Sequence, residues 1–341
     1  MYVGRLHRWS VGLVCSVTAL LGASSGSHAH HPAAVGSFLK AEEPASGLRI
    51  EVSERYTSAT TLQQGSKEVP NRKHEFLDTS ITQVGLAYDV TPKWGAQLVL
   101  PIIVHEFRRV KDGGTDRGDE TGPGDLSLVG VYRPIWRAGP RGALRLSLFA
   151  GLKLPSGDSS LLAEEREEDH HEAGGVVTAS HASVRSAAHG VEDGGIHGHD
   201  LALGSGSVDG LVGSDVYASW NRLFGTASIQ YAIRGEGDFG YRFANELVWS
   251  GGPGVLLVRT PMYAVGLQAF LSGLTKGNDE QDGQSVGDTA FTGLYMGPRA
   301  VFTWGRSLAA DVSGELPLVQ HNTGLQIVPD YTIRATLSWR F

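Results

Sequence analysis

The chain ends on Tyr331-Thr-Ile-Arg-Ala-Thr-Leu-Ser-Trp-Arg-Phe341, a stretch in which one apolar residue alternates with one polar residue. Successive side chains of a β-strand point to opposite faces, so this strand would have an apolar face and a polar face that carries Arg334 and Arg340. A half-buried strand of a soluble β-sandwich would rarely turn two arginines inward and finish on Phe341. Apolar residues outside, polar residues inside and aromatic residues at the ends are typical of an outer-membrane barrel. The stretch therefore predicts an all-β fold, a transmembrane antiparallel β-barrel.

The first residues predict export from the cytoplasm. Arg5 and Arg8 precede an apolar core at residues 11–23, and Ser27-His28-Ala29 supplies the small residues that a signal peptidase reads. This core is too short for a membrane-spanning helix, which needs about 20 apolar residues. We therefore expect cleavage after Ala29.

The two ends of the chain together predict the location and the domain order. We expect the cell outer membrane of a Gram-negative bacterium, with membrane lipid around the barrel and the barrel-assembly machinery recognising the strand that ends in Phe341. The expected segments are a signal peptide at 1–29, a periplasmic N-terminal segment at 30–46 and the barrel at 47–341.

The strand pattern predicts about twelve strands, most of them near the ten residues that a tilted barrel strand needs. After the signal peptide no apolar run is long enough for a spanning helix, so a membrane-embedded chain would have to close as a barrel. Long connections, above all residues 156–207, alternate with tight turns, which we expect outside the cell and in the periplasm respectively. The expected strands are 47–57, 76–90, 93–108, 124–137, 142–155, 208–220, 223–235, 240–251, 261–274, 289–304, 306–319 and 326–341.

Charge and cysteine content exclude several classes of function. The formal charge of −7 becomes −9 when Arg5 and Arg8 are removed (−7 − 2), and no block of Lys or Arg suggests a nucleic-acid partner. Cys15 is the only cysteine and lies in the predicted signal peptide. The mature chain would then contain no disulfide, no thiolate metal site and no cysteine nucleophile.

The polar faces of the strands predict a charged lumen. These charges either pair across the interior and keep the barrel closed or rigid, or they include unpaired arginines along a water-filled passage that favours anions. The residues predicted to line the lumen are Arg49, Glu51, Arg55, Arg145, Lys153, Arg234, Glu246, Arg299, Asp311, Glu315, Arg334 and Arg340.

Three short motifs carry a family resemblance. Gly124-Asp-Leu-Ser-Leu-Val-Gly-Val-Tyr132, Gly151-Leu-Lys-Leu-Pro-Ser-Gly157 and Leu203-Gly-Ser-Gly-Ser-Val-Asp209 resemble, in order and spacing, the outer-membrane transporter family of the phenol meta-cleavage (MetA) degradation pathway. The resemblance implies a barrel that admits small organic compounds, often aromatic or apolar. It carries over no binding residues, and the long connection between Gly157 and Leu203 departs from the family pattern.

That connection is rich in histidine and acid. It holds six of the thirteen histidines of the chain, together with Glu164-Glu-Arg-Glu-Glu-Asp169. Neutral imidazoles and carboxylates suit zinc, copper or nickel, although the spacing is not that of a helical i, i+4 site. A solvated loop without metal is the alternative, and a second metal possibility is the mature N-terminus. The candidate metal ligands are His170, His171, His181, His189, His197 and His199 in the loop, and His30 and His31 at the N-terminus.

We expect no enzyme and no cofactor other than such a metal. Hydrolysis of lipids would need a serine and a histidine near the outer leaflet, where only His74, His105 and His321 are available outside the loop and the N-terminus. The expected function is a channel or passive transporter for small organic solutes. A metal-capturing surface protein and a purely structural barrel are the alternatives.

Overall fold

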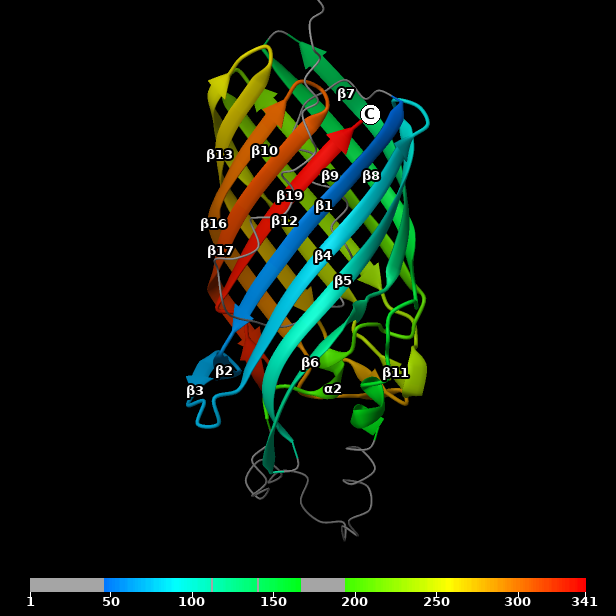
Figure 1. Ribbon diagram of the computed structural model, residues 1–341, viewed down its shortest axis with the longest axis vertical. Coiled ribbons are helices and arrows are strands. Elements are labelled where there is room, and N and C mark those ends of the chain that lie inside the picture. The colour runs from blue at the N-terminus through cyan, green and yellow to red at the C-terminus, as the bar shows by residue number, and fades with distance from the viewer. Residues whose placement is uncertain (1–45, 112, 140, 167–193) are drawn as a thin grey trace, which may run out of the picture.

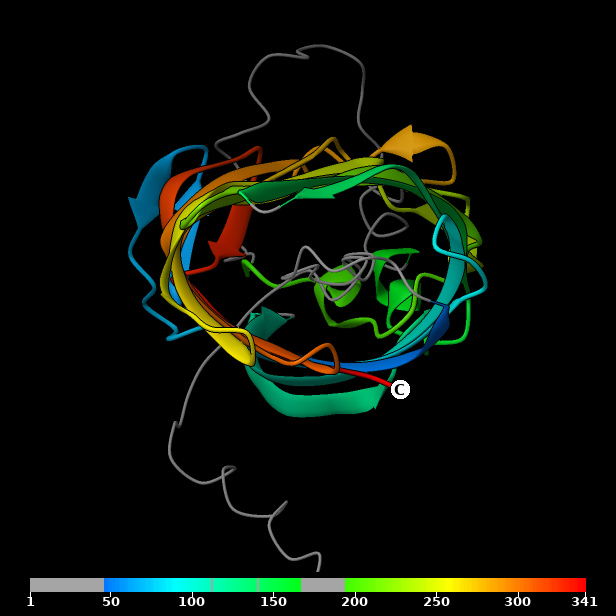
Figure 2. The same ribbon diagram turned by 90° about the horizontal axis from the view of Figure 1, so that it is seen from above.

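A computed structural model describes residues 46–111, 113–139, 141–166 and 194–341 as a β-barrel (Figure 1). The long strands are tilted in the same sense and surround a lumen, as the view along the axis shows (Figure 2). The barrel strands are β1 (Gly47–Ala59), β4 (Phe76–Asp89), β5 (Trp94–Lys111), β7 (Leu126–Gly139), β8 (Gly142–Leu154), β9 (Asp209–Trp220), β10 (Leu223–Ile233), β12 (Glu246–Arg259), β13 (Tyr263–Lys276), β16 (Phe291–Trp304), β17 (Leu308–Asn322) and β19 (Tyr331–Arg340).

Every neighbouring pair in the barrel is antiparallel, and the ring of twelve strands closes. The first and last barrel strands, β1 and β19, pair along ten positions from Arg49↔Arg340 to Ser58↔Tyr331, and β4 pairs with β5. Closure satisfies each backbone N–H and C=O between strands, which lipid demands. The predicted fold class, a twelve-stranded antiparallel barrel, is confirmed.

One stretch of the wall is built differently. The strand β6 (Gly114–Pro123) pairs with the C-terminal half of β5, from Ile102 to Lys111. The strand β7 pairs with the N-terminal part of β5, from Trp94 to Val99. The chain therefore leaves the ladder between Pro123 and Leu126, at Gly124 and Asp125. This break brings Asp125 to the point where the candidate site forms.

Side chains alternate between the two faces as the sequence predicts. On β8, Leu144, Leu148 and Leu152 are exposed on the outside, while Arg145 and Lys153 are buried on the inside. Burial of an arginine in the wall would be costly without polar partners, so the inner face must supply them. Those partners are described below.

The tryptophans lie mainly at one end of the barrel. Trp94, Trp220, Trp304 and Trp339 are exposed residues next to the short turns, and Trp136 is near another of them, whereas Trp249 lies near the opposite end of its strand. Aromatic rings favour the headgroup level of a membrane. The aromatic belt is therefore concentrated on the side that carries the C-terminus in Figure 1.

Two strands differ most from the prediction. Residues 240–251 were expected to form a strand, but β12 begins at Glu246 and continues through Gly251-Gly252-Pro253-Gly254 to Arg259. Glycines and a proline normally end a strand, yet here Gly251 and Gly252 adopt φ of +153° and +147° and stay within the ladder. The expected strand 326–341 is also divided, because β19 begins only at Tyr331.

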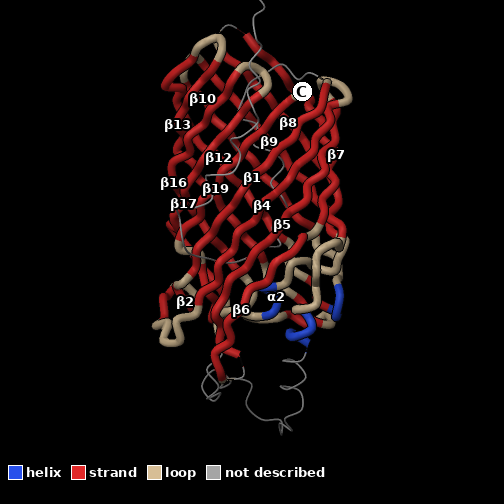
Figure 3. Tube along the Cα trace, in the orientation of Figure 1, coloured by secondary structure: helices blue, strands red, loops and turns tan. Residues whose placement is uncertain are grey.

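The residues outside these strands form small elements at the end opposite the C-terminus (Figure 3). Among the described residues no helix is long and apolar enough to span a membrane. Two three-stranded sheets extend this rim, one of β2, β3 and β18 and one of β11, β14 and β15. The bounds are β2 (Thr61–Gln64), β3 (Lys67–Val69), β18 (Leu325–Val328), β11 (Tyr241–Arg242), β14 (Glu280–Gln281), β15 (Gln284–Ser285), the 3₁₀ turn η1 (Asp238–Gly240) and the helix α2 (Gly198–Leu201).

Candidate functional site in the barrel lumen

The described ends of the long connection between β8 and β9, residues 155–166 and 194–208, fold inward at the rim, and we call them the plug segment. Its helix α2 lies within the ring of strands (Figure 2). The side chains of Ile196 and Leu201 are buried against Leu77 and Phe107 of the wall. A hydrated loop was one expectation for this stretch, but its described ends are packed.

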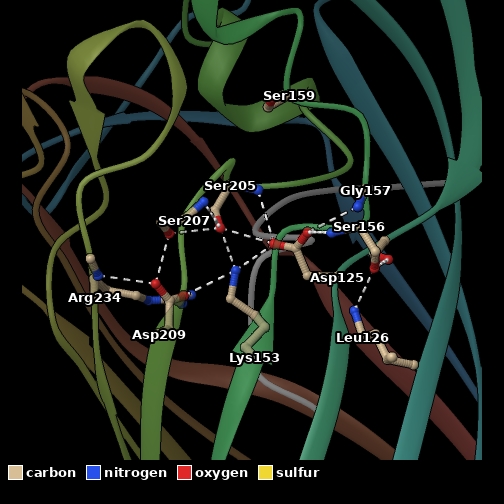
Figure 4. Close-up of polar contacts among 12 residues, drawn as sticks. Asp125, Leu126, Lys153, Ser156, Gly157, Ser159, Ser205, Ser207, Asp209 and Arg234 are labelled. Atoms are coloured by element: carbon tan, nitrogen blue, oxygen red, sulfur yellow. Dashed lines mark hydrogen bonds and ion pairs between the residues drawn. The ribbon is translucent and has the colours of Figure 1, made fainter.

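The Asp125 carboxylate fastens the plug segment to the wall at several points (Figure 4). Asp125 accepts the backbone N–H groups of Ser156 at 3.1 Å, Gly157 at 3.0 Å and Ser205 at 2.9 Å. It thus satisfies donors from both ends of the plug segment at once. Hydrogen bonds to an ionised acceptor are the strong ones, so the Asp125 carboxylate fixes where the connection leaves and rejoins the barrel.

The same place requires glycine because three chain segments cross there. A Cβ on Gly157 would lie 2.7 Å from the carbonyl oxygen of Leu203, 2.8 Å from Cα of Gly204 and 3.0 Å from Cα of Gly124. No side chain fits between backbones at such distances. The crossing explains why each of the three motifs contains a glycine at this position.

Charged side chains complete the arrangement, which we call the polar cluster: Asp125, Lys153, Ser205, Ser207, Asp209 and Arg234. Lys153 bonds to Asp125 and lies 3.0 Å from Asp209, and Arg234 contacts Asp209 at 2.8 Å. All six residues are buried. Because each charge has opposite-charge partners, the cluster holds the plug segment to the wall and leaves little attraction for a solute.

A second buried cluster stabilises the plug segment itself. His199 contacts Glu165 at 3.0 Å and Asp200 at 3.6 Å through its two ring nitrogens, and its ring stacks on Tyr241 at 5.9 Å. Burial alone would lower the pKa of His199, but Asp200 and Glu165 outweigh it and raise that pKa to about 10. Burial raises the pKa of Glu165, but the charge and the hydrogen bonds of His199 lower it more, so that the pKa of Glu165 is about 2. The pair is therefore an imidazolium and a carboxylate at neutral pH.

These contacts bear on the metal prediction. Both nitrogens of His199 face carboxylates, and among the described residues no group of three or more His, Cys, Asp or Glu could hold a metal. His197 stacks on His199 at 5.6 Å. Metal binding stays a prediction, since the remaining candidate ligands lie outside the described residues: His30, His31, His170, His171, His181 and His189.

The three histidines weighed for hydrolysis lie apart from one another. His105 is fully buried and bonds to Thr79 at 2.8 Å, and His321 bonds to Ser66 at 2.8 Å on an exposed hairpin. His74 occupies a turn with φ of +54°. The structure does not bring them together into one site.

The residues predicted to line the lumen divide into two groups by burial, and the half-buried group lies entirely on β1 and β19. Arg145, Lys153, Arg234, Glu246, Arg299, Asp311 and Glu315 are buried, and Arg49, Glu51, Arg55, Arg334 and Arg340 are half-buried. Several of their ion pairs run along the wall: Arg299 contacts Asp311 on the next strand at 2.8 Å, and Arg340 contacts Asp89 at 2.8 Å. Pairing of this kind fixes side chains to the wall without bridging the lumen.

Sequence reasoning overlooked three of the acids that hold these cations. Asp125 and Asp209 stand inside the quoted motifs, and Asp89 closes β4, where it contacts both Arg340 and Arg133, the latter at 2.7 Å. A detectable signal existed, because each acid lies at the end of a strand, next to a motif or a turn. The pairing of an acid with a particular cation depends on the fold and could not be read from spacing.

Comparison with known proteins supports the fold. No protein-family model matches the sequence, and no curated protein matches it. Among solved structures, an outer membrane channel from Pseudomonas putida F1 matches with a TM-score of 0.59 and 12% identity, over 90% of this chain and 100% of that chain. The β-domain of the Bordetella autotransporter BrkA matches with a TM-score of 0.43 and 11% identity, over 87% and 100%. The first likeness establishes that this chain has the fold of an outer-membrane β-barrel.

Proposed function

We propose that the protein is an outer-membrane channel or passive transporter for small organic solutes. The observation that carries the proposal is a charged lumen wall whose ion pairs, such as Arg299–Asp311, join neighbouring strands. Charged groups on the inner face suit a water-filled passage, because in a dry interior they would cost free energy. Pairs that join neighbouring strands leave the lumen unbridged, which favours a channel over a barrel that its own charges hold closed.

The plug segment is the part of the protein that could regulate entry into this passage. It is fastened on one side by the polar cluster and packs on the other through Leu201 against the wall. A polar attachment can open by exchanging its hydrogen bonds for water, since each bond to the ionised Asp125 carboxylate contributes a net gain of only about 1.5–3 kcal/mol. We propose that movement of the plug segment regulates entry.

The proposal that the solutes are aromatic or apolar compounds of a phenol degradation pathway rests on the three motifs. Their convergence at Asp125, Gly157 and Ser205 makes them parts of one structural unit, which supports the resemblance. The lumen-facing charges do not by themselves favour an apolar cargo. We therefore propose solutes that combine an aromatic body with a polar group.

Liposome swelling tests the channel. Proteoliposomes in isosmotic arabinose should swell, and the Asp125→Asn variant should swell several-fold faster because the plug segment loses its anchor. The Ser66→Ala variant, changed on the exposed hairpin, should behave like the wild type. Absence of swelling in both the wild type and Asp125→Asn would contradict the proposal.

A further inference from the structure

Most arginines of the lumen wall have an acidic partner. Arg299 contacts Asp311, and Arg133 and Arg340 share Asp89. Arg234 contacts Asp209 at 2.8 Å and Glu246 at 3.5 Å. Each of these guanidinium groups has a carboxylate partner within the wall and offers less to a passing anion than an arginine that lacks one.

Arg55 and Arg334 differ from them. They are direct register partners on β1 and β19, so two positive charges stand side by side on the inner face. The other neighbours in register are Ile81 beside Arg55 and Ser313 beside Arg334, neither of them acidic. Within the part of the chain that the structure describes, no carboxylate lies at ion-pair distance from either arginine.

The nearest acids act on this pair only from a distance. Glu246 and Glu315 contribute to the potential at Arg55, which also feels the repulsion of Arg334. The Glu315 carboxylate accepts a hydrogen bond from Ser272 on β13, and Glu246 contacts Arg234. Like charges directly opposite one another on neighbouring strands are destabilising, so the wall retains here an unfavourable contact that its own acids do not relieve.

The position of the pair suits a solute that has passed the plug segment. Ile81, next to Arg55 on β4, packs with Ile103 and with Leu203 of the plug segment. The two arginines are half-buried, in contrast to the buried Arg299. They therefore lie beside the inner surface of the plug segment and remain accessible from the lumen.

We propose that Arg55 and Arg334 together bind the carboxylate of a small organic anion in the lumen. Each planar guanidinium can donate two parallel hydrogen bonds to a carboxylate, and two of them on adjacent strands can bracket one such group. The bound carboxylate also removes the repulsion between the two arginines. This inference rests on the proposed channel function and names its solute class, an organic acid in ionised form.

The direct test is benzoate binding to the full-length protein in detergent, measured by calorimetry and by thermal shift. Benzoate should bind the wild type and raise its melting temperature. The Arg55→Gln/Arg334→Gln variant should bind at least about tenfold more weakly, because charge-assisted hydrogen bonds are lost. The matched control is Arg299→Gln/Asp311→Asn, which removes a neutralised pair from the same wall and should retain benzoate binding.

Selectivity in planar bilayers gives the second measurement. Reversal potentials in potassium benzoate gradients should show preference for the anion in the wild type, reduced about tenfold in the double arginine variant and within about twofold in the control. Unchanged binding and selectivity in the arginine variant would overturn the inference while leaving the channel standing. A wild type that binds benzoate through the two arginines but conducts no ion would uphold the inference and overturn the channel instead.

Discussion

The carboxylate of Asp125 accepts the backbone N–H of Ser205 at 2.9 Å although the two residues are 80 positions apart in the chain. The contact joins the break between β6 and β7 to the return of the long connection toward β9. A buried carboxylate that holds several donors at once is a point on which the surrounding structure depends. The plug segment should therefore respond to changes at this residue more than at any exposed acid nearby.

Replacing Asp125 with Asn should destabilise the barrel by about 3 kcal/mol, because Lys153 would lose one of its two acidic partners inside the wall. Heat-modifiable mobility and circular dichroism at increasing temperature measure the loss. The exposed Asp119 on β6 provides the control, and Asp119→Asn should keep the wild-type transition. Equal transitions for the two variants would show that the Asp125 contacts contribute nothing.

Gly204 should tolerate no side chain. A Cβ there would lie 2.5 Å from the carbonyl carbon of Gly157, so Gly204→Ala must push two backbones apart at a cost of about 1–3 kcal/mol. We expect faster proteolysis of the plug segment in intact proteoliposomes. Gly277→Ala is the matched control, since a Cβ on Gly277 meets no atom within 4 Å. Identical cleavage rates would contradict the crowded crossing.

The plug segment should be most firmly seated in mildly acidic solution. The folded pKa of His199 is raised to about 10 from 6.5, so its stabilisation is complete below pH 6.5 and declines as the pH rises toward 10. The pKa of Glu165 is lowered from 4.5 to about 2, so its contribution is complete above pH 4.5 and declines below it. Both contributions are therefore complete between pH 4.5 and pH 6.5.

Channel conductance recorded from pH 5.5 to pH 9 measures this effect. Conductance should rise with pH in the wild type, because His199 released from its carboxylates has the ordinary pKa of 6.5 and gives up its proton, which favours release of the plug segment. The rise should disappear in His199→Gln. His321→Gln changes an exposed histidine and should retain the wild-type profile. A rise that persists in His199→Gln would assign the pH dependence to another group.

Phe341 should matter for assembly rather than for the stability of the finished barrel. Its side chain is 71% exposed, and its backbone N–H donates to the carbonyl of Leu48 at 2.9 Å. We expect Phe341→Ala to lower the amount of folded barrel in outer-membrane fractions while the purified variant melts as the wild type does. Phe239→Ala, at another exposed phenylalanine, is the control. Normal membrane levels of Phe341→Ala would show that the terminal residue is no recognition signal.

The sequence predicted the wall well and the plug segment poorly, for a physical reason. Strand β19 alternates strictly because one face meets lipid and the other the lumen, and such alternation is visible in one dimension. The start of β12 at Glu246 was missed because Gly251 to Gly254 resemble a turn. The plug segment has no period at all, and contacts such as His199–Glu165 depend on where the barrel places both residues.

The uneven distribution of tryptophans indicates the level of the membrane at which the plug segment lies. If the rings of Trp94 and Trp339 mark the inner headgroup level, an apolar band of about 25 Å ends well below the tip of β5, whose 18 residues rise about 45 Å at a usual barrel tilt. Lys153 lies about 30 Å above the same rim, near the end of β8. The plug segment therefore sits level with the outer headgroups, and in the proposed channel a solute passes it before it reaches the two arginines in the bilayer interior.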